Sequence, residues 1–282
     1  MSADDRCSHL SINSWLETKR LEGRTTRTIK YYRDTAERLA GYLGKDPKDA
    51  TSAEIRSFLA SLQSTCSNVT INNYRRNINS YYQYLEDEDV IQKSPMRRIH
   101  YIKEEKRVKT PFTDEELARI VGSCNRKVES AVVLFLSTTA CRVGELVGIL
   151  TANVDMIERE ATVYGKGRKE RIVFFDARTK IALDEYLSER NDESPYLFAT
   201  RRGTRYTVGA IEQMVRNVGT RANVEHCHPH RFRRTVATRA LDRGMPIEQV
   251  KELLGHSQIQ TTLIYASVSK NNVKESHRRY VQ

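Results

Sequence analysis

A charged segment at residues 94–111, SPMRRIHYIKEEKRVKTP, divides the chain into two regions with different hydrophobic patterns. It carries Pro95 and Pro111 and shows no sustained period of apolar residues, which is typical of a linker between domains. At 282 residues the chain is long enough for two domains of ordinary size. We therefore expect a first domain at residues 1–94, a linker at 95–111 and a second domain at 112–282.

The first region has the pattern of a helical bundle. Apolar side chains recur at helical spacing in four segments, residues 10–23, 25–44, 51–63 and 68–87. Thr51 and Glu54 have the spacing of a capping box at the start of the third segment. The fourth segment repeats tyrosines along its apolar face, and we expect that face to lie in the core.

The second region combines helices with one short sheet. Thr113 and Glu116 predict another capped helix start. The segment EATVYGKGRKERIVFF at 160–175 has two β-branched, alternating runs around a glycine-rich basic tip, which predicts a β-hairpin. Helical patterns then continue, including one that begins near Pro229. The expected fold is mainly α with a small antiparallel sheet, in two domains.

The charge of the chain favours a polyanionic partner. Lys and Arg number 47 against 36 Asp and Glu, a net charge of +11, which suits nucleic acid or an anionic membrane surface. No apolar run approaches the length of a membrane-spanning helix, and the N-terminus lacks the order of a signal peptide. The five scattered cysteines indicate reduced thiols in the cytoplasm. A basic protein without such a partner remains the alternative on charge alone.

Seven polar residues of the second region could act together on a phosphodiester: Arg142, Glu145, Lys166, His230, Arg233, His256 and Tyr265. Singly, each has a structural explanation, such as an ion pair, a turn lysine, a helix cap or a core histidine. Together, arginine forks could hold phosphate oxygens, histidines could exchange protons, and lysine could protonate a leaving oxygen. A tyrosine is only about 0.1% ionised at pH 7, so it would need such a cationic setting to act as a nucleophile.

Four segments of the second region carry five motifs: TACRVGEL at 139–146, YGKGRKER at 164–171, HPHRFRRTVAT at 228–238 and LGHSQIQTTLIY at 254–265, the last of which holds both a histidine motif and a tyrosine motif. These five motifs, in this order, resemble those of the tyrosine recombinases of the phage-integrase, Xer and Cre family. TIKYY at 28–32 also resembles the start of the family's N-terminal core-binding domain. The resemblance covers nearly the whole chain. It implies catalytic roles for Arg142, Lys166, His230, Arg233 and His256, with Glu145 as the companion of Arg142. It also implies that Tyr265 is the nucleophile.

The motif HPHRFRRTVAT can be read in two registers, because His228 and Arg231 have the same spacing as His230 and Arg233. The family follows its arginine with one basic residue and then Thr, a hydrophobic residue, Ala and Thr. Only Arg233 is followed in this way, by RTVAT, so we expect His228 and Arg231 to be cap and surface residues. The sequence departs from the family at Ala140, where glycine is usual, and at Arg234, where histidine is usual. Ala140 could alter the turn that positions Arg142.

The resemblance implies a site-specific DNA recombinase that forms a 3′-phosphotyrosyl intermediate. It implies a C-shaped clamp made of a helical core-binding domain and a catalytic domain. The partners would be double-stranded DNA at a specific site and further copies of the chain, a dimer per site and a tetramer in the synapse. Candidate DNA contacts are Arg75, Arg76, Arg168 and Lys169. A type IB topoisomerase and a catalytically silent DNA-binding protein are the alternatives.

No cofactor, metal, nucleotide or membrane is expected. HCHPH at 226–230 is rich in possible zinc ligands, but the chain offers no second ligand pair at a suitable spacing. The tail at 267–282 could pack on its own domain or on a neighbouring protomer, and the sequence leaves this choice open.

Overall fold

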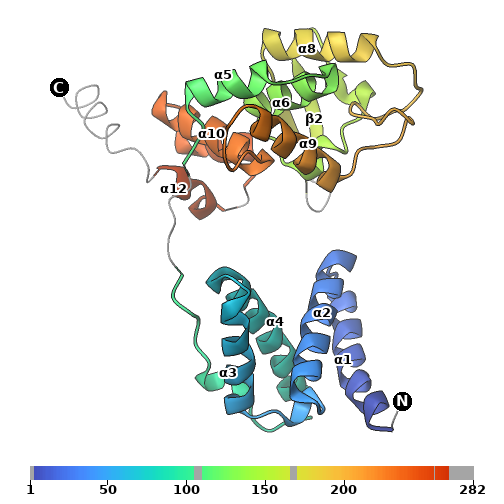
Figure 1. Cartoon of the computed structure of the whole chain (residues 1–282), viewed down its shortest axis with the longest axis vertical. Helices are drawn as coiled ribbons and strands as arrows, with labels where there is room; N and C mark the ends of the chain where they lie inside the picture. Colours follow the sequence, from blue (N-terminus) through green and yellow to red (C-terminus); the bar gives the residue numbers. More distant parts are fainter. Residues whose placement is uncertain (1–2, 105–109, 166–169, 257, 267–282) are drawn as a thin grey trace, which may run out of the picture. The chain divides into compact units, whose positions relative to one another are not determined.

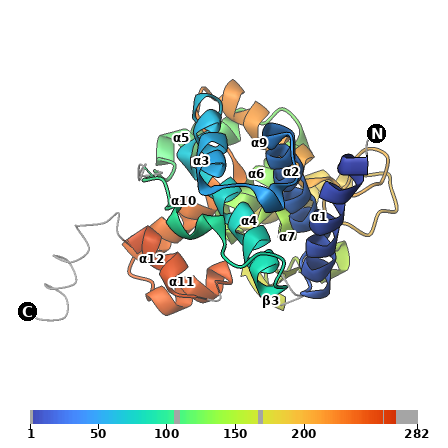
Figure 2. The ribbon, with the colours of Figure 1, turned by 90° about the horizontal axis from the view of Figure 1, so that it is seen from below.

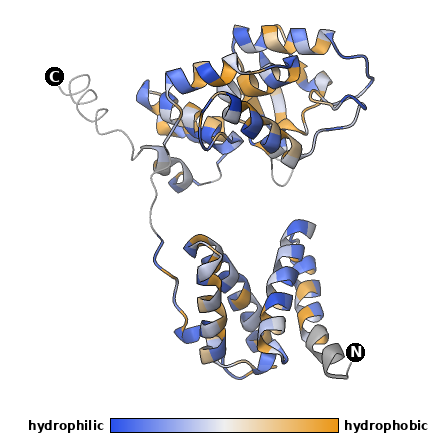
Figure 3. Ribbon diagram, viewed as in Figure 1, coloured by the Kyte–Doolittle hydropathy of each residue, from blue (hydrophilic) through white to orange (hydrophobic). Residues whose placement is uncertain are grey.

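The computed structural model describes residues 3–104, 110–165, 170–256 and 258–266 (Figure 1). The chain forms two compact units, Met1–Arg107 and Val108–Gln282. Helices dominate both units, and the second also contains one three-stranded antiparallel sheet. The predicted fold class, mainly α with a small antiparallel sheet, is confirmed. In Figure 3 most helices carry both hydrophilic and hydrophobic residues, as amphipathic helices do.

The first unit contains the four predicted helices. They are α1 Ala3–Leu21, α2 Thr26–Leu43, α3 Ser52–Ser61 and α4 Asn68–Asp87, with short 3₁₀ turns at Pro47–Asp49, Leu62–Ser64 and Pro95–Arg98. The capping box of Thr51 and Glu54 is present at the start of α3. Gly44 ends α2 in the left-handed conformation with φ of 64°, which glycine adopts without strain.

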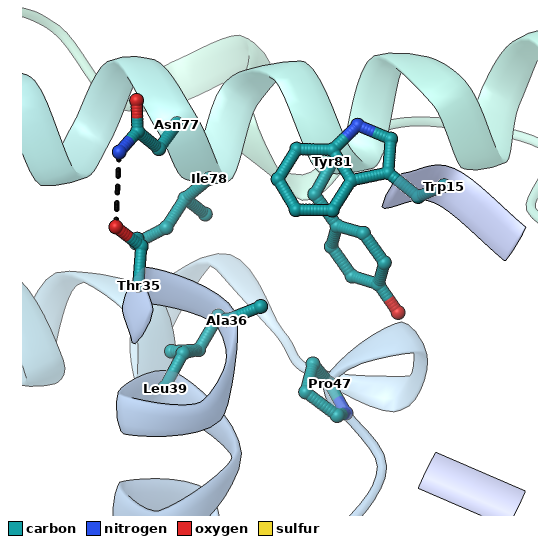
Figure 4. Close-up of a pocket in the computed structure, with 8 residues that line it drawn as sticks. All are labelled: Trp15, Thr35, Ala36, Leu39, Pro47, Asn77, Ile78 and Tyr81. Carbon is teal, nitrogen blue, oxygen red and sulfur yellow. Dashed lines mark hydrogen bonds between the residues drawn. The ribbon is translucent and has the colours of Figure 1, made fainter. Parts of the chain in front are cut away.

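The core of the first unit is rich in aromatic side chains, as the tyrosine pattern predicted. Trp15 is fully buried, stacks on Tyr32 and meets Tyr81 edge-on. Figure 4 shows a small pocket beside Trp15, where the Asn77 amide donates a buried hydrogen bond of 2.9 Å to the Thr35 hydroxyl. This bond ties α4 to α2 within the core.

Part of the segment predicted as a linker packs onto the first unit. Met96 and Ile99 are buried in its core. Arg75 on α4 donates two hydrogen bonds to the Ile99 carbonyl, and its guanidinium lies over the Tyr101 ring, 4.1 Å from the centroid. The chain up to Ile102 is held further by Asn72, which bonds both the N–H and the carbonyl of Ile102.

The second unit is built around a buried helix and a small sheet. Its helices are α5 Asp114–Gly122, α6 Lys127–Thr139, α7 Val143–Leu146, α8 Ala177–Ser188, α9 Val208–Arg221, α10 Pro229–Asp242, α11 Ile247–Leu254 and α12 Gln260–Ala266. A 3₁₀ turn at Thr151–Asn153 leads into β1 Val154–Asp155, which pairs with β2 Glu160–Tyr164 and then β3 Glu170–Phe174. Residues 131–136, AVVLFL, lie on α6 and are almost completely buried.

The predicted hairpin is formed by β2 and β3. Val163 pairs with Arg171, and both side chains point toward the core, whereas Ile172 and Phe174 face outward and are exposed. The hairpin tip at 166–169 lies outside the described residues, and so do Lys166, Arg168 and Lys169. The predicted tail at 267–282 also lies outside them.

The last three described helices bring distant motifs together. Helices α10, α11 and α12 lie side by side (Figure 2). A small apolar cluster joins Ala140, Ala237, Val250 and Leu254, and Tyr265 packs against it. Among the helices that the structure describes, none combines the length and apolar character that a membrane-spanning segment needs.

Candidate active site

Arg142 is held at the start of α7 by the carboxylate of Glu145. The Arg142 backbone N–H donates to Glu145 Oε2 at 2.8 Å, and its guanidinium Nη1 donates to Oε1 at 2.7 Å. Glu145 is only 4% exposed, whereas the Arg142 side chain is 38% exposed. A buried acceptor therefore fixes a cationic side chain that is itself partly exposed. The structure thus pairs Arg142 with Glu145, its predicted companion.

A further arginine, Arg171 on β3, binds the same Glu145 carboxylate. Its Nη2 donates to Glu145 Oε2 at 2.7 Å. Burial alone would raise the pKa of Glu145, but the Arg142 N–H and the two guanidinium groups outweigh it and lower the pKa below its usual value. Glu145 is therefore a carboxylate at neutral pH. Arg171 was not among the residues predicted from the sequence. Its side chain lies on the same face of the hairpin as its cross-strand partner Val163.

Arg233 lies on α10, and its guanidinium is buried. Its Nη1 donates to the Ala140 carbonyl at 2.6 Å, and its Nη2 donates to the Leu254 carbonyl. Burial, followed by the charges of Arg142 and Arg171, lowers the pKa of Arg233 to about 10. The group is still cationic at pH 7, and three positive charges are collected in one place.

All three arginines donate hydrogen bonds to backbone carbonyls at the C-terminus of α11. The carbonyls of Leu253, Leu254 and Gly255 accept hydrogen bonds from Arg171, Arg233 and Arg142 respectively. The last carbonyls of a helix lack partners within the helix and carry the negative end of its dipole. Three successive backbone acceptors thereby stabilise three neighbouring cations.

His256 follows this helix end directly. Its Nδ1 lies 2.8 Å from the Thr262 hydroxyl, which is completely buried. Partial burial, followed by the charges of Arg233, Arg142 and Arg171, lowers the pKa of His256 to about 4. The imidazole is therefore neutral at pH 7.

Tyr265 lies beside this histidine on α12. The two rings are stacked with their centroids 6.3 Å apart and their planes at 18°. Tyr265 is partly buried against the cluster that contains Ala140 and Leu254. The structure thus brings Arg142, Glu145, Arg233, His256 and Tyr265 of the predicted set into one region.

His230 and His228 have different roles at the start of α10. The Nδ1 of His228 accepts a hydrogen bond from the Arg231 N–H, so His228 is the predicted helix cap. His230 keeps an exposed edge, but partial burial and the charge of Arg233 lower the pKa of its imidazole. His230 and Arg233 lie one turn apart on this helix.

Arg231 is not the surface residue that we predicted. It is 9% exposed, donates to both carboxylate oxygens of Glu116 and to the Glu225 carbonyl, and lies 4.1 Å from the centroid of the Phe112 ring. The prediction was wrong because Glu116 lies far away in sequence, and its carboxylate offsets the cost of burying the guanidinium. Arg231 therefore anchors α10 to the beginning of the second unit.

The remaining predictions concern contacts with DNA and the binding of a metal ion. Arg76 is exposed on α4, whereas Arg75 is engaged with Ile99 and Tyr101 as described above. Within the described part of the chain, no group of three His, Cys, Asp or Glu side chains could hold a metal ion. The geometry around Tyr265 instead offers guanidinium groups and neutral imidazoles, which suit a phosphate group.

Comparison with known proteins agrees with this geometry. Residues 93–272 match the phage integrase family, and residues 12–92 match the phage integrase N-terminal SAM-like domain. The tyrosine recombinase XerC of Oceanobacillus iheyensis is 29% identical, over 96% of this chain and 95% of the relative.

Two solved structures have the same fold. The Tn1549 transposon integrase, in complex with transposon right end DNA, has a TM-score of 0.79 at 19% identity, covering 96% of this chain and 99% of the other. A lambda integrase tetramer bound to a Holliday junction has a TM-score of 0.74 at 17% identity, covering 89% and 77%. The match to the family extends over most of the chain and includes every described residue of the site. The chain therefore belongs to the phage integrase family, the family of the tyrosine recombinases.

Proposed function

We propose that this protein catalyses site-specific DNA recombination with Tyr265 as the nucleophile. The observation that supports this proposal best is the placement of Tyr265 against neutral His256 and near the guanidinium group of Arg233, with that of Arg142 close to the same histidine. Attack on a phosphodiester places additional negative charge on the non-bridging oxygens, and preorganised cationic donors stabilise that charge.

In the proposed reaction, the Tyr265 oxygen forms a bond to the scissile phosphorus as the bond to the 5′ oxygen breaks. Arg142 and Arg233 hold the non-bridging oxygens, and neutral His230 accepts the tyrosine proton. His256 donates through Nε2 when its Nδ1 accepts from Thr262. Lys166 protonates the leaving 5′ oxygen. Attack by the 5′ hydroxyl of a partner strand reverses these steps, so neither metal, cofactor nor nucleotide is consumed.

The substrate in this proposal is double-stranded DNA carrying a specific recombination site, in the cytoplasm. Residues 1–94 would form the core-binding domain, residues 95–111 the connection, and residues 112–282 the catalytic domain. Arg76, Arg168 and Lys169 would contact DNA. Arg75 would do so only with the donors that Ile99 leaves free. By analogy with the lambda integrase tetramer, two protomers would bind each site and four would form the synapse.

The test is to trap covalent complexes on a library of nicked duplexes and to sequence the DNA that is held. The wild-type protein should form an adduct that resists denaturation. Tyr265→Phe should bind the same DNA and form none, because only the nucleophilic oxygen is removed. An adduct with the phenylalanine variant would disprove this assignment. Joining of two separate selected duplexes would then distinguish recombination from nicking and resealing of one duplex.

A further inference from the structure

Arg171 is a largely buried side chain that links several parts of the site. Its side chain is 13% exposed and spans from the Glu145 carboxylate to the Leu253 carbonyl, with bonds of 2.7 and 2.5 Å. These partners lie on α7 and at the end of α11, and Arg171 itself lies on β3. One side chain therefore connects three elements of the site.

Each partner of Arg171 also determines the position of a proposed catalytic group. The second oxygen of Glu145 bonds the Arg142 guanidinium. The Leu253 carbonyl is followed directly by the Leu254 and Gly255 carbonyls that bond Arg233 and Arg142, and then by His256. Displacement of either partner would consequently move an arginine that holds the phosphate or the histidine beside Tyr265.

The fit around Arg171 is close. A Cβ atom on Gly255 would lie 2.7 Å from Cδ and 2.9 Å from Nε of Arg171, so the bare glycine backbone covers this side chain. Gly255 has φ of +59°, in the left-handed region that glycine favours. Among the described residues, Arg171 Nε is buried without a hydrogen-bond partner. Burial of this nitrogen without a partner is unfavourable, and the hydrogen bonds that Nη1 and Nη2 donate offset that cost.

We infer that Arg171 is a positioning residue for the cleavage step, holding Glu145 and the end of α11 so that Arg142, Arg233 and His256 meet the phosphate together. This inference rests on the proposed function. It predicts that loss of Arg171 slows cleavage without weakening DNA binding, because Arg171 acts through other residues.

The charge of Arg171 also gives a signature in the pH profile. Glu145 is faced by Arg142, Arg171, Arg233 and the thiol of Cys141, and the three guanidinium groups favour its ionised form. His256 is faced by the same three arginines and by the Tyr265 ring. Removing one positive charge raises the pKa of Glu145 and of His256. Both changes move the acidic limb of the cleavage rate to higher pH.

The experiment compares Arg171→Gln with Arg190→Gln. Arg190 is a matched control in the same unit, because its side chain is 10% exposed and bonds Asp192 and the Tyr196 and Leu197 carbonyls, away from the site. Single-turnover cleavage is measured on a nicked duplex selected by wild-type adduct trapping, together with DNA affinity and circular dichroism. Arg171→Gln should cleave about 10- to 100-fold more slowly with nearly unchanged affinity, as a small misplacement of catalytic groups does. Its acidic limb should lie at higher pH, and Arg190→Gln should show neither change.

Arg171→Lys keeps the charge but can supply only part of the paired geometry. It should fall between wild type and Arg171→Gln in rate, with the wild-type pH limb, and it replaces the glutamine variant if that variant does not fold. A wild-type rate in Arg171→Lys and Arg171→Gln, or losses and pH limbs equal to those of Arg190→Gln, would overturn the inference. Absence of an adduct with wild-type protein would instead refute the proposed function.

Discussion

The Nδ1 atom of His256 lies 2.8 Å from the hydroxyl of Thr262, three residues before Tyr265. Thr262 and Tyr265 share α12, so one hydrogen bond fixes the histidine relative to the helix that carries the proposed nucleophile. When Nδ1 accepts this bond, the other ring nitrogen carries the proton and remains available as a donor.

Thr262→Val should slow DNA cleavage about three- to tenfold while the second unit stays folded. The substitution keeps the buried volume and removes only the hydroxyl, whose hydrogen bond contributes about 0.5–1.5 kcal/mol. Thr262→Ser keeps the hydroxyl and should cleave at nearly the wild-type rate. Single-turnover adduct formation measures both. Equal rates for the valine and serine variants would contradict the role of this bond.

His256 should make the second unit less stable in acid. Its pKa is about 4 when folded and 6.5 ordinarily, so between these values the unfolded chain binds a proton that the folded chain does not. Stability is therefore unaffected above pH 6.5 and falls as the pH decreases toward 4. In urea unfolding followed by circular dichroism, wild type should lose more stability from pH 7 to 5 than His256→Asn. The only tryptophan, Trp15, reports separately on the first unit. Equal losses would contradict the prediction.

Ala140 should tolerate glycine but not valine. It ends α6 with φ of 52°, is completely buried, and its carbonyl accepts from Arg233. Ala140→Gly releases the strain of the left-handed conformation, which stabilises the folded state by about 1–2 kcal/mol. The loss of a buried methyl group and the greater conformational entropy of the unfolded chain destabilise it by nearly the same amount. Ala140→Gly should therefore lie within about 1 kcal/mol of wild type. Ala140→Val should cost about 2–4 kcal/mol through strain and overpacking. Thermal unfolding measures both, and a stable valine variant would contradict the assigned backbone conformation.

Substitution by alanine should have different effects on stability at two glycines of α9. A Cβ on Gly219 would lie 2.1 Å from Cys227 Cβ, whereas a Cβ on Gly209 would meet nothing within 4 Å. Gly219→Ala should destabilise the second unit by about 1–3 kcal/mol, and Gly209→Ala should be neutral or stabilise it by up to about 1 kcal/mol. Urea unfolding by circular dichroism should show both effects, with the Trp15 transition unchanged. Similar effects at both positions would contradict this packing.

DNA cleavage should survive treatment with EDTA. The guanidinium groups of Arg142 and Arg233 supply the positive charge that a metal ion supplies in other phosphoryl-transfer sites. Adduct formation on the selected nicked duplex, with and without chelator, measures this. Loss of cleavage that zinc or magnesium restores would point back to the histidines of HCHPH at 226–230.

The features that the sequence predicted well depend on neighbours along the chain. The capping boxes of Thr51 with Glu54 and of Thr113 with Glu116 need partners only three residues apart, and both are present. The β2–β3 hairpin likewise needs only alternation and a glycine-rich tip. The motifs that carry Arg142, Arg233, His256 and Tyr265 can also be read from the sequence, because their common order along the chain is informative before their contacts are known.

The features that the sequence missed depend on tertiary partners. Arg171 follows the basic pair Arg168 and Lys169, and no local signal separates it from them. Its partners lie 26 and 82 residues away. The outward face of β3 carries Ile172 and Phe174, so hydrophobicity alone would have placed Arg171 in solvent. Arg231 was misjudged for the same reason, since Glu116 lies 115 residues away.

The end of α11 has a consequence for which sequence changes the site can accept. The three arginines bond the backbone carbonyls of residues 253–255, so the acceptors do not depend on which side chains stand there. Insertion or deletion of one residue is different, since it rotates a helix by about 100° and shifts it by about 1.5 Å. All three bonds would lose their alignment at once. Substitution and length variation are therefore unequal here: a change of the Leu253 side chain leaves all three acceptors in place, Gly255 has no room for a Cβ beside Arg171, and the number of residues in this helix end is fixed.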